Sequence, residues 1–232
     1  MEFTTPFSSS STTENGGTVS TKVRLKSAPL SPVTITLNSS DTQEGTVSPT
    51  VLTFNKDNWD SYVSIIVTGV DDDIADGSQS YEIQIASVVS EDSKYSALNG
   101  QINPIKLQNE DDEIKAIVLG SLSGDTTEVG GNATFSVKLA SKPIEAVSIP
   151  IISTDTSEGT VSVSSLSFDN SNYNTVQTVT VNGEDDDERD GNIAYQVKIG
   201  PTSSNSLPYN NVESLTHSIT NIDNETSGVT VS

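Results

Sequence analysis

The sequence contains no cysteine and, among 232 residues, only one histidine, one methionine and one tryptophan. The absence of cysteine excludes disulfides, zinc–thiolate sites, iron–sulfur clusters and a thiol nucleophile. Basic residues are also scarce, because 11 Lys and Arg stand against 32 Asp and Glu for a formal net charge of -21. Nucleic acids and anionic membranes are bound mainly through basic side chains, so we expect neither as a partner.

Long apolar runs are missing as well. No segment approaches the roughly 18 apolar residues of a membrane-spanning helix, so we expect no membrane insertion. The start, Met1-Glu2-Phe3-Thr4, lacks the basic and apolar regions of a signal peptide. We therefore interpret the chain as a fragment of a longer protein.

The apolar residues that are present favour strands. Val and Ile outnumber Leu, Ser and Thr are abundant, and apolar residues alternate with polar ones over segments such as 19–25 and 133–139. About seven such segments follow one another in each half of the chain, with no useful helical period. This pattern predicts an all-β protein of two tandem seven-stranded antiparallel β-sandwiches with an immunoglobulin-like architecture.

An internal repeat divides the chain. A shift of 114 residues places Glu44-Gly45-Thr46-Val47-Ser48 on Glu158-Gly159-Thr160-Val161-Ser162, and Asp71-Asp72-Asp73 on Asp185-Asp186-Asp187. A two-residue deletion then aligns Asn109-Glu110-Asp111 with Asn221-Ile222-Asp223. The sequence therefore predicts two modules, residues 1–113 and 114–232.

Acidic residues follow alternate strands of this prediction. If each strand runs opposite to the one before it, the loops that hold Glu14, Asp41 and Glu44, the run 71–76 and the run 111–113 all lie at one end of the first module. The second module repeats the arrangement. Because clustered carboxylates repel one another, such an end needs a compensating cation.

Calcium suits these loops best, because Ca²⁺ accepts six to eight oxygen ligands in irregular geometry. Mg²⁺ demands a near-ideal octahedron, and softer metals prefer imidazole or thiolate ligands. The alternative is that the acidic loops are only solvated turns. An EF-hand is excluded, because Asp76 occupies the glycine position of a loop counted from Asp71.

These motifs resemble the Calx-beta domain, a seven-stranded sandwich of sodium–calcium exchangers and bacterial surface proteins. The residues that carry the resemblance are Glu14-x-x-Gly17, Leu52-Thr53-Phe54 before Asn58-Trp59, Asp71-Asp72-Asp73, Asp76-Gly77 before Tyr81, and Asp111-Asp112-Glu113. The resemblance covers nearly the whole chain, twice. The variant with Glu-Gly-Thr-Val-Ser and Asn-Trp is similar to the tandem copies in long exported bacterial proteins.

The resemblance implies a set of calcium ligands in each module. In the first they are Glu14, Asp71, Asp72, the Ile74 carbonyl, Asp76, Asp111, Asp112 and Glu113. In the second they are Glu128, Asp185, Asp186, Glu188, Asp190, Asp223 and Glu225, with Asn224 in place of a carboxylate. It also implies an acidic residue before the fourth strand, for which the chain offers Asp41 or Glu44, and Asp155 or Glu158.

Other residues have simpler interpretations. Glu44-Gly45 and Glu158-Gly159 are typical of turns, where glycine adopts a positive φ, and we favour this over metal binding. Trp59 and Tyr173 are interpreted as core or sheet-edge fillers rather than sugar platforms. Asn58 and Asn172 are expected to bond the local backbone.

The sequence does not favour an enzyme. Its only histidine, His217, has no counterpart in the first module, and no Gly-rich phosphate loop precedes a helix. We predict a calcium-binding segment of a larger bacterial cell-surface or secreted protein. It would act as a calcium-stiffened spacer or adhesive segment beside neighbouring repeats of the same chain, with a cation bracing the junction near Ile114.

Two alternatives stay open. In one, the loops or the Trp59 face bind a host or cell-surface protein or a glycan, and calcium is secondary. In the other, the modules have lost calcium and act as plain spacers, which their charge keeps in solution.

Overall fold

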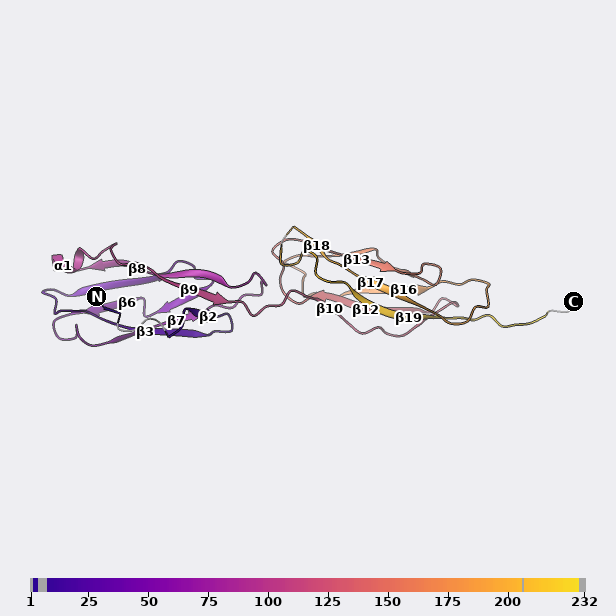
Figure 1. Ribbon diagram of the computed structural model, residues 1–232, viewed down its shortest axis with the longest axis horizontal. Helices are drawn as coiled ribbons and strands as arrows, with labels where there is room; N and C mark the ends of the chain where they lie inside the picture. The colour runs from indigo at the N-terminus through magenta and orange to yellow at the C-terminus, as the bar shows by residue number, and fades with distance from the viewer. Residues whose placement is uncertain (1, 4–7, 206, 230–232) are drawn as a thin grey trace. The chain divides into compact units, whose positions relative to one another are not determined.

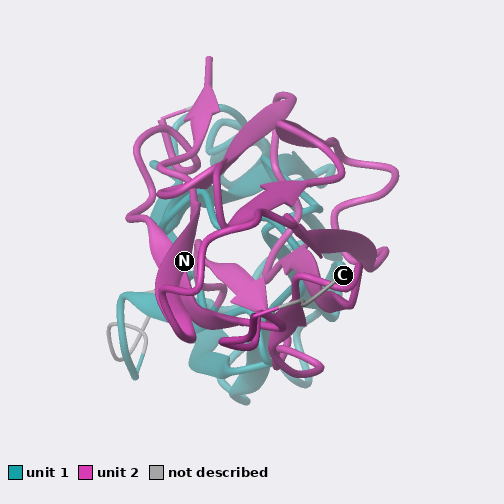
Figure 2. Cartoon of the chain, turned by 90° about the vertical axis from the view of Figure 1, so that its right-hand side faces the viewer, with its two compact units in different colours: residues 1–112 teal, residues 113–232 magenta. Residues whose placement is uncertain are grey.

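The computed structural model describes residues 2–3, 8–205 and 207–229. Almost all of its regular structure is β-strand, which confirms the predicted all-β class (Figure 1). The chain divides into two compact units, Met1–Asp112 and Glu113–Ser232 (Figure 2). Among the described residues, no helix has the length and apolar character needed to cross a membrane.

The first unit is built from two sheets. One has the strand order β1-β3-β7-β5, and the other has the order β2-β9-β8-β4-β6. The strands are β1 (Glu2–Phe3), β2 (Ser11–Thr13), β3 (Thr18–Arg24), β4 (Val33–Ser39), β5 (Gly45–Ser48), β6 (Val51–Phe54), β7 (Val63–Gly69), β8 (Gln79–Val89) and β9 (Ile105–Glu110). A single helical turn, α1 (Ser93–Ser96), was not predicted, and the Asp92 side chain caps it by accepting from the Lys94 N–H.

The second unit repeats this plan with sheets of order β10-β12-β16-β14 and β11-β19-β17-β13-β15, with β18 also paired to β13. Its strands are β10 (Ile117–Leu119), β11 (Thr126–Thr127), β12 (Asn132–Leu139), β13 (Val147–Ser153), β14 (Gly159–Val161), β15 (Ser165–Phe168), β16 (Gln177–Gly183), β17 (Ile193–Ile199), β18 (Ser203–Ser204) and β19 (Leu215–Ile222).

In each unit, one predicted strand is preceded by a short strand that belongs to the other sheet. In the first unit, β5 pairs antiparallel with β7, whereas β6 pairs antiparallel with β4 of the other sheet. Gly45 at the start of β5 lies beside Gly69 at the end of β7, and Phe54 at the end of β6 lies beside Val33 at the start of β4. β5 and β6 therefore run in the same direction and together cross the sandwich once. The alternation of strand directions predicted from the sequence is therefore kept, although β5 itself was missed.

The cores form where the apolar faces of the two sheets meet. In the first unit the buried residues include Val23, Phe54, Val67 and Tyr81, and in the second a matching cluster surrounds Phe168. The burial pattern of β3 alternates strictly, as the period of two in its sequence predicts. Trp59 and Tyr173 pack against these cores, in agreement with their interpretation as fillers.

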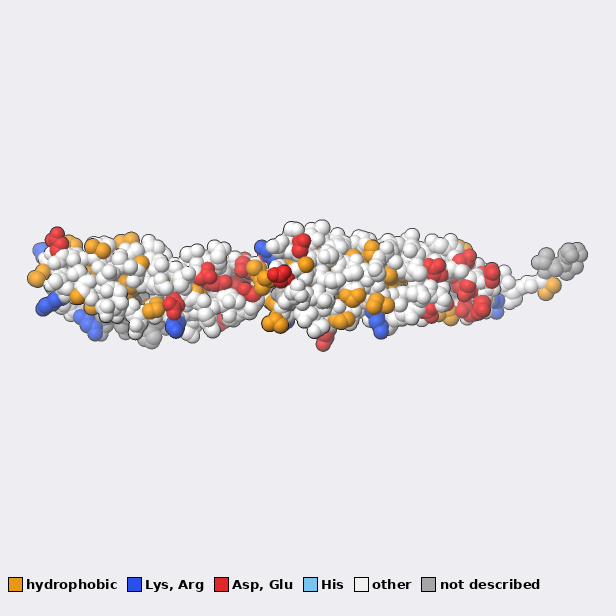
Figure 3. Space-filling view, turned by 90° about the horizontal axis from the view of Figure 1, so that it is seen from above, with side chains coloured by type: hydrophobic (Ala, Val, Ile, Leu, Met, Phe, Trp, Pro, Cys, Tyr) orange, Lys and Arg blue, Asp and Glu red, His pale blue; other side chains and the backbone are white. Residues whose placement is uncertain are grey.

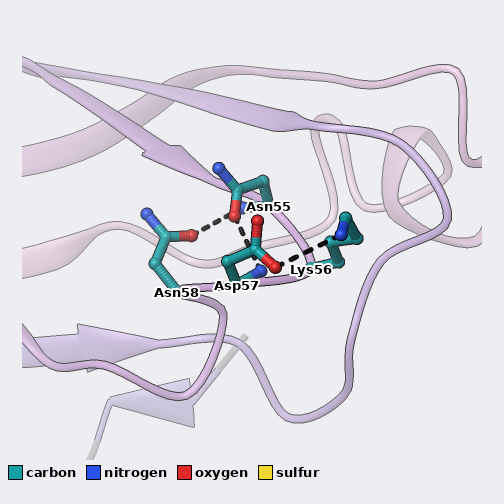
Figure 4. Close-up of polar contacts among 4 residues, drawn as sticks. All are labelled: Asn55, Lys56, Asp57 and Asn58. Carbon is teal, nitrogen blue, oxygen red and sulfur yellow. Dashed lines mark hydrogen bonds and ion pairs between the residues drawn. The ribbon is translucent and has the colours of Figure 1, made fainter.

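Two asparagines fix the turn after the fourth predicted strand. Oδ1 of Asn58 accepts the Asn55 N–H at 2.6 Å, and its Nδ2 donates to the Thr53 carbonyl at 3.2 Å. Figure 4 shows this turn, in which Lys56 also pairs with Asp57 at 3.4 Å. Asn172 repeats both bonds in the second unit, so the predicted role of these residues is confirmed.

Candidate metal centres

Acidic side chains gather at one end of each unit, which we call its acidic pole. In the first unit it carries the loops after β2, β4, β7 and β9, and in the second those after β11, β13, β16 and β19. Figure 3 shows the second unit's pole as a concentration of Asp and Glu side chains next to the C-terminal segment. The run 111–113 after β9, or 223–225 after β19, is called the closing run.

Three groups of carboxylates at the poles place oxygen atoms within 4.8 Å of one another, close enough to share a cation. They are Glu14 with Asp112 and Glu113, Glu128 with Asp223 and Glu225, and Glu158 with Asp186 and Asp190. The first two groups are equivalent under the repeat. Both combine the first-loop glutamate with the closing run.

Short parallel strands bring the first-loop glutamates to the closing runs. β2 pairs parallel with β9, and the Glu14 N–H donates to the Glu110 carbonyl at 3.0 Å. The second unit repeats this contact, with the Glu128 N–H donating to Ile222 at 3.2 Å. Glu14 is 2% exposed and Glu128 is 4% exposed. An ionised carboxylate is buried this deeply only at a cost unless it is paired or binds a metal.

The closing run also holds the loop after β7 or β16. The Asp223 carboxylate accepts the Gly191 N–H at 2.7 Å, and Asp111 accepts from Gly77 in the same way. Both glycines have a positive φ, 80° for Gly191 and 79° for Gly77, which L side chains rarely adopt. In each pole, a backbone hydrogen bond therefore joins the closing run to a second acidic loop.

Glu225 carries the clearest sign of this crowding. The neighbouring Glu128 carboxyl, burial and the nearby Asp223 together raise the pKa of Glu225 to about 7. Its Oε2 atom is buried. When both are ionised, the carboxylates of Glu225 and Glu128 have no hydrogen to donate to each other, so their close approach requires a proton or a cation between them.

Of the acidic residues before β5 and β14, Glu158 lies among other carboxylates, and Asp41 and Asp155 are held within their own turns. Glu158 joins a cation-sized group, whereas Oδ1 of Asp155 accepts the N–H of Ser157 at 3.1 Å within its own turn. Asp41 makes the equivalent bond with Gln43 at 2.9 Å. Geometry therefore favours Glu158 over Asp155, and the repeat extends this preference to Glu44 over Asp41.

Burial raises the pKa of both glutamates. For Glu158 the charges of Asp190, Asp155 and Asp186 raise the pKa further, against a lowering by the hydrogen bond from Asn221. For Glu44, burial again comes first, Asn109 lowers the pKa, and Asp76, Asp41 and Asp72 raise it. Burial also raises the pKa of Asp76. A cation or a proton bound at these positions would therefore reduce the electrostatic repulsion among the carboxylates of the pole.

The turn interpretation of Glu44-Gly45 and Glu158-Gly159 gave the wrong reason for the glycines. Neither glycine is among the positive-φ residues, and each begins a strand, β5 or β14. A Cβ at Gly45 would overlap the ring of Tyr81, and one at Gly159 would overlap Tyr195. Glycine is needed here for close approach to a buried tyrosine, which leaves the preceding glutamate at the pole.

The remaining predicted ligands surround these groups. The Asp72 carboxylate accepts the Ile74 N–H at 2.6 Å, the Ile74 carbonyl accepts from Asp76 at 2.8 Å, and Asp186 accepts from Glu188 at 2.7 Å. The described residues form no cation-sized group that includes Asp71, Asp72, Asp76, Asp111, Asp185 or Glu188. These six residues lie in the pole loops, but their carboxylates do not converge on a common cation position.

Sequence reasoning overlooked two buried asparagines beneath the poles. Asn109 is fully buried, and its Nδ2 donates to the Val70 carbonyl at 2.8 Å and reaches Glu44 at 3.5 Å. Asn221 repeats this with Glu184 at 2.9 Å and Glu158 at 3.4 Å. The recurrence of Asn-x-Asp in both copies was the available signal.

His217 has a packing role. Its ring lies 4.9 Å from that of Phe135, and Nε2 is 3.1 Å from the carbonyl oxygen of Gly120. These contacts place it within the sandwich of the second unit, on β19.

Comparison with known proteins gives limited similarity. No family model matches the chain, and no curated protein matches it. Among solved structures, it is similar to domains 4 and 5 of the S-layer protein SbsC, with 14% identity over 82% of this chain and 77% of that one, at a TM-score of 0.36. It is also similar to CBD12 from CALX1.2, with 14% identity over 85% and 79% of the two chains and a TM-score of 0.34. The calcium-binding domain CBD12 of CALX1.1 is 13% identical over 87% and 81%, at a TM-score of 0.35.

Proposed function

We propose that each unit binds Ca²⁺ at its acidic pole, and that the chain is a non-catalytic, calcium-stabilised spacer segment of a larger bacterial cell-surface or secreted protein. The observation that carries the proposal is the meeting of a buried first-loop glutamate with closing-run carboxylates, within 4.8 Å, at equivalent positions of both units. Solvated acidic turns would not require a glutamate that is 2% or 4% exposed.

The donor set favours calcium over other cations. The groups offer carboxylate oxygens alone, with no thiolate or imidazole, which suits a hard cation. The ligands come from loops of different strands, and such irregular, oxygen-rich geometry suits Ca²⁺ better than Mg²⁺.

We assign the primary sites to Glu14, Asp112 and Glu113, and to Glu128, Asp223 and Glu225. A second site in the second unit consists of Glu158, Asp186 and Asp190. By the repeat, its counterpart in the first unit would be Glu44, Asp72 and Asp76. Their carboxylates form no cation-sized group among the described residues, but their charges interact. Asp71, Asp111, Asp185, Glu188 and the Ile74 carbonyl are proposed to complete the coordination shells.

Calcium would act mainly on stability and stiffness. By cancelling repulsion among loops that leave four different strands, the ion would stabilise the folded unit by RT ln(1 + [Ca²⁺]/Kd). The closing run of the first unit leads directly into the segment at Ile114. Fixing that run would restrict the start of the linker, which is the property that a spacer needs.

A binding face for a glycan or a host protein has less support. Trp59, the aromatic residue considered for sugar stacking, packs against the core of the first unit. Adhesion through other surfaces stays a prediction, as does contact with neighbouring repeats.

Thermal unfolding tests the proposal. The midpoint is measured in EGTA, in millimolar Ca²⁺ and in millimolar Mg²⁺, for the native chain and for Glu14→Gln and Glu128→Gln. We expect Ca²⁺ to raise the midpoint more than Mg²⁺, and each substitution to remove part of the increase. Glu91→Gln and Glu213→Gln, at exposed sites outside the pole loops, are matched controls. Equal effects of Ca²⁺ and Mg²⁺, or equal losses in the controls, would contradict the proposal.

A further inference from the structure

Asn224 ties together two parts of the second acidic pole. Its backbone N–H donates to Oε2 of Glu128 at 3.0 Å, and its side-chain Nδ2 donates to Oδ1 of Asp185 at 3.0 Å. Glu128 begins the loop after β11, and Asp185 lies in the loop after β16, so one residue bridges carboxylates from two separate loops. This is the connection that a bridging cation would otherwise make.

The first unit has a carboxylate at this position. Under the repeat, Asn224 aligns with Asp112 and Asp185 with Asp71. An ionised aspartate has no hydrogen to donate, so Asp112 cannot make the side-chain bond that Asn224 makes to its acidic neighbour. It adds a negative charge instead, and it joins the cation-sized group with Glu14 and Glu113.

We propose that Asn224 is a positioning residue that takes over part of the cation's role, so that the two units differ in their need for calcium. This inference rests on the proposed function and deepens it. The second pole stays largely assembled without calcium because the amide of Asn224 holds Asp185 near Glu128. The first pole, with Asp112 in that place, depends on the ion, and it loosens more than the second when calcium is removed.

The second unit keeps a cation site nonetheless. Glu128, Asp223 and Glu225 still converge. Because Asn224 is uncharged, this unit binds calcium more weakly than the first and also needs it less. As calcium falls, the second unit would then release its ion first and stay assembled, and the first unit would loosen when its own ion leaves.

A reciprocal exchange tests this in the full chain. Hydrogen exchange resolved by peptide is followed in EGTA and in millimolar Ca²⁺ for the native chain, Asn224→Asp and Asp112→Asn. In EGTA we expect Asn224→Asp to lose about tenfold in protection over 184–191, as befits a hydrogen bond to a charged group. Asp112→Asn is expected to gain protection over 70–77. Calcium should restore protection in Asn224→Asp and bring the two native poles closer together in protection.

Asn170→Asp, an exposed site outside the pole loops of the second unit, is the control for added charge. If Asn224→Asp loses no more protection in EGTA than this control, the inference is wrong even where calcium stabilises both units. If Asn224→Asp loses protection and calcium restores none of it, while the native chain is also indifferent to calcium, the proposed function fails and the cation role of Asn224 fails with it.

Discussion

The backbone N–H of Gly191 donates to Oδ2 of Asp223 across 2.7 Å, and this bond joins the loop after β16 to the closing run of the second unit. Gly191 has a φ of 80°, a conformation that is strained for any residue with a Cβ. The loop therefore depends on glycine for the direction of its donor. Gly77 and Asp111 form the same pair in the first unit.

Replacing this glycine should damage the pole without touching the core. We expect Gly191→Ala to destabilise the second unit by about 1–2 kcal/mol, the usual cost of a left-handed conformation for an L-residue. Urea unfolding measures the change, with Gly124→Ala as the control, because Gly124 has no positive φ and an added Cβ there would meet no atom within 4 Å. Equal effects of the two substitutions would show that the conformation of Gly191 is unimportant.

The glycine that begins β14 has a different role. An alanine Cβ at Gly159 would overlap the hydroxyl and ring of Tyr195, which is itself 4% exposed. We expect Gly159→Ala to cost about 1–3 kcal/mol by overpacking, and to displace Glu158 from the pole. Calcium titration by calorimetry should then give weaker binding. Unchanged stability and affinity would mean that the tyrosine can move aside freely.

Asn109, the buried asparagine of the first unit, allows a test of how far its hydrogen bonds stabilise the loops of the acidic pole. Asn109→Ala would leave the Val70 carbonyl without the Asn109 amide that donates to it at 2.8 Å, and would remove the acceptor to which the Thr12 hydroxyl donates at 2.9 Å. We expect a loss of about 1–3 kcal/mol, the cost of unsatisfied buried polar groups. Chemical unfolding checks it against the exposed Asn170→Ala, which should change stability little.

Most of the strands that the sequence predicted have alternating burial, although β5 alternates too and was missed. β3, β12 and β15 follow the period of two, because one face of each packs on the core. β2 was missed because its buried residue is Thr12, which is held by hydrogen bonds to Tyr81 and Asn109 rather than by hydrophobic contact. Hydrophobic periodicity cannot detect a strand whose inward residue is polar.

The same limit applies to the poles. The sequence could predict that the acidic loops lie at one end, because that depends only on the alternating direction of the strands. Whether Asp155 or Glu158 faces the other carboxylates depends on how the turn before β14 closes, since Ser157 engages Asp155. The bridging bonds of Asn224 likewise depend on side-chain geometry. The sequence could show only that a carboxylate was missing there.

The pH dependence of stability should differ between chelated and calcium-loaded protein. The folded state raises the pKa of Glu225 from 4.5 to about 7, because the Glu128 carboxyl lies beside it. Between these values the folded state binds more protons than the unfolded state, so this contribution to stability is full below pH 4.5 and is lost as the pH rises through 7. In EGTA we therefore expect the second unit to become less stable from pH 5 to pH 8.

Calcium should flatten this profile, because the cation replaces the proton between Glu225 and Glu128. Glu225→Gln should flatten it in EGTA as well, since the amide does not titrate and can donate to Glu128. The raised pKa values of Glu44 and Glu158 act in the same direction in the native chain, so a residual slope remains after the substitution. Asp223 has a lowered pKa, and its contribution is lost only as the pH falls below about 3.8, outside the measured range. Thermal unfolding at pH 5, 6, 7 and 8 decides the matter, and a slope in EGTA that Glu225→Gln leaves unchanged would place the titrating group elsewhere.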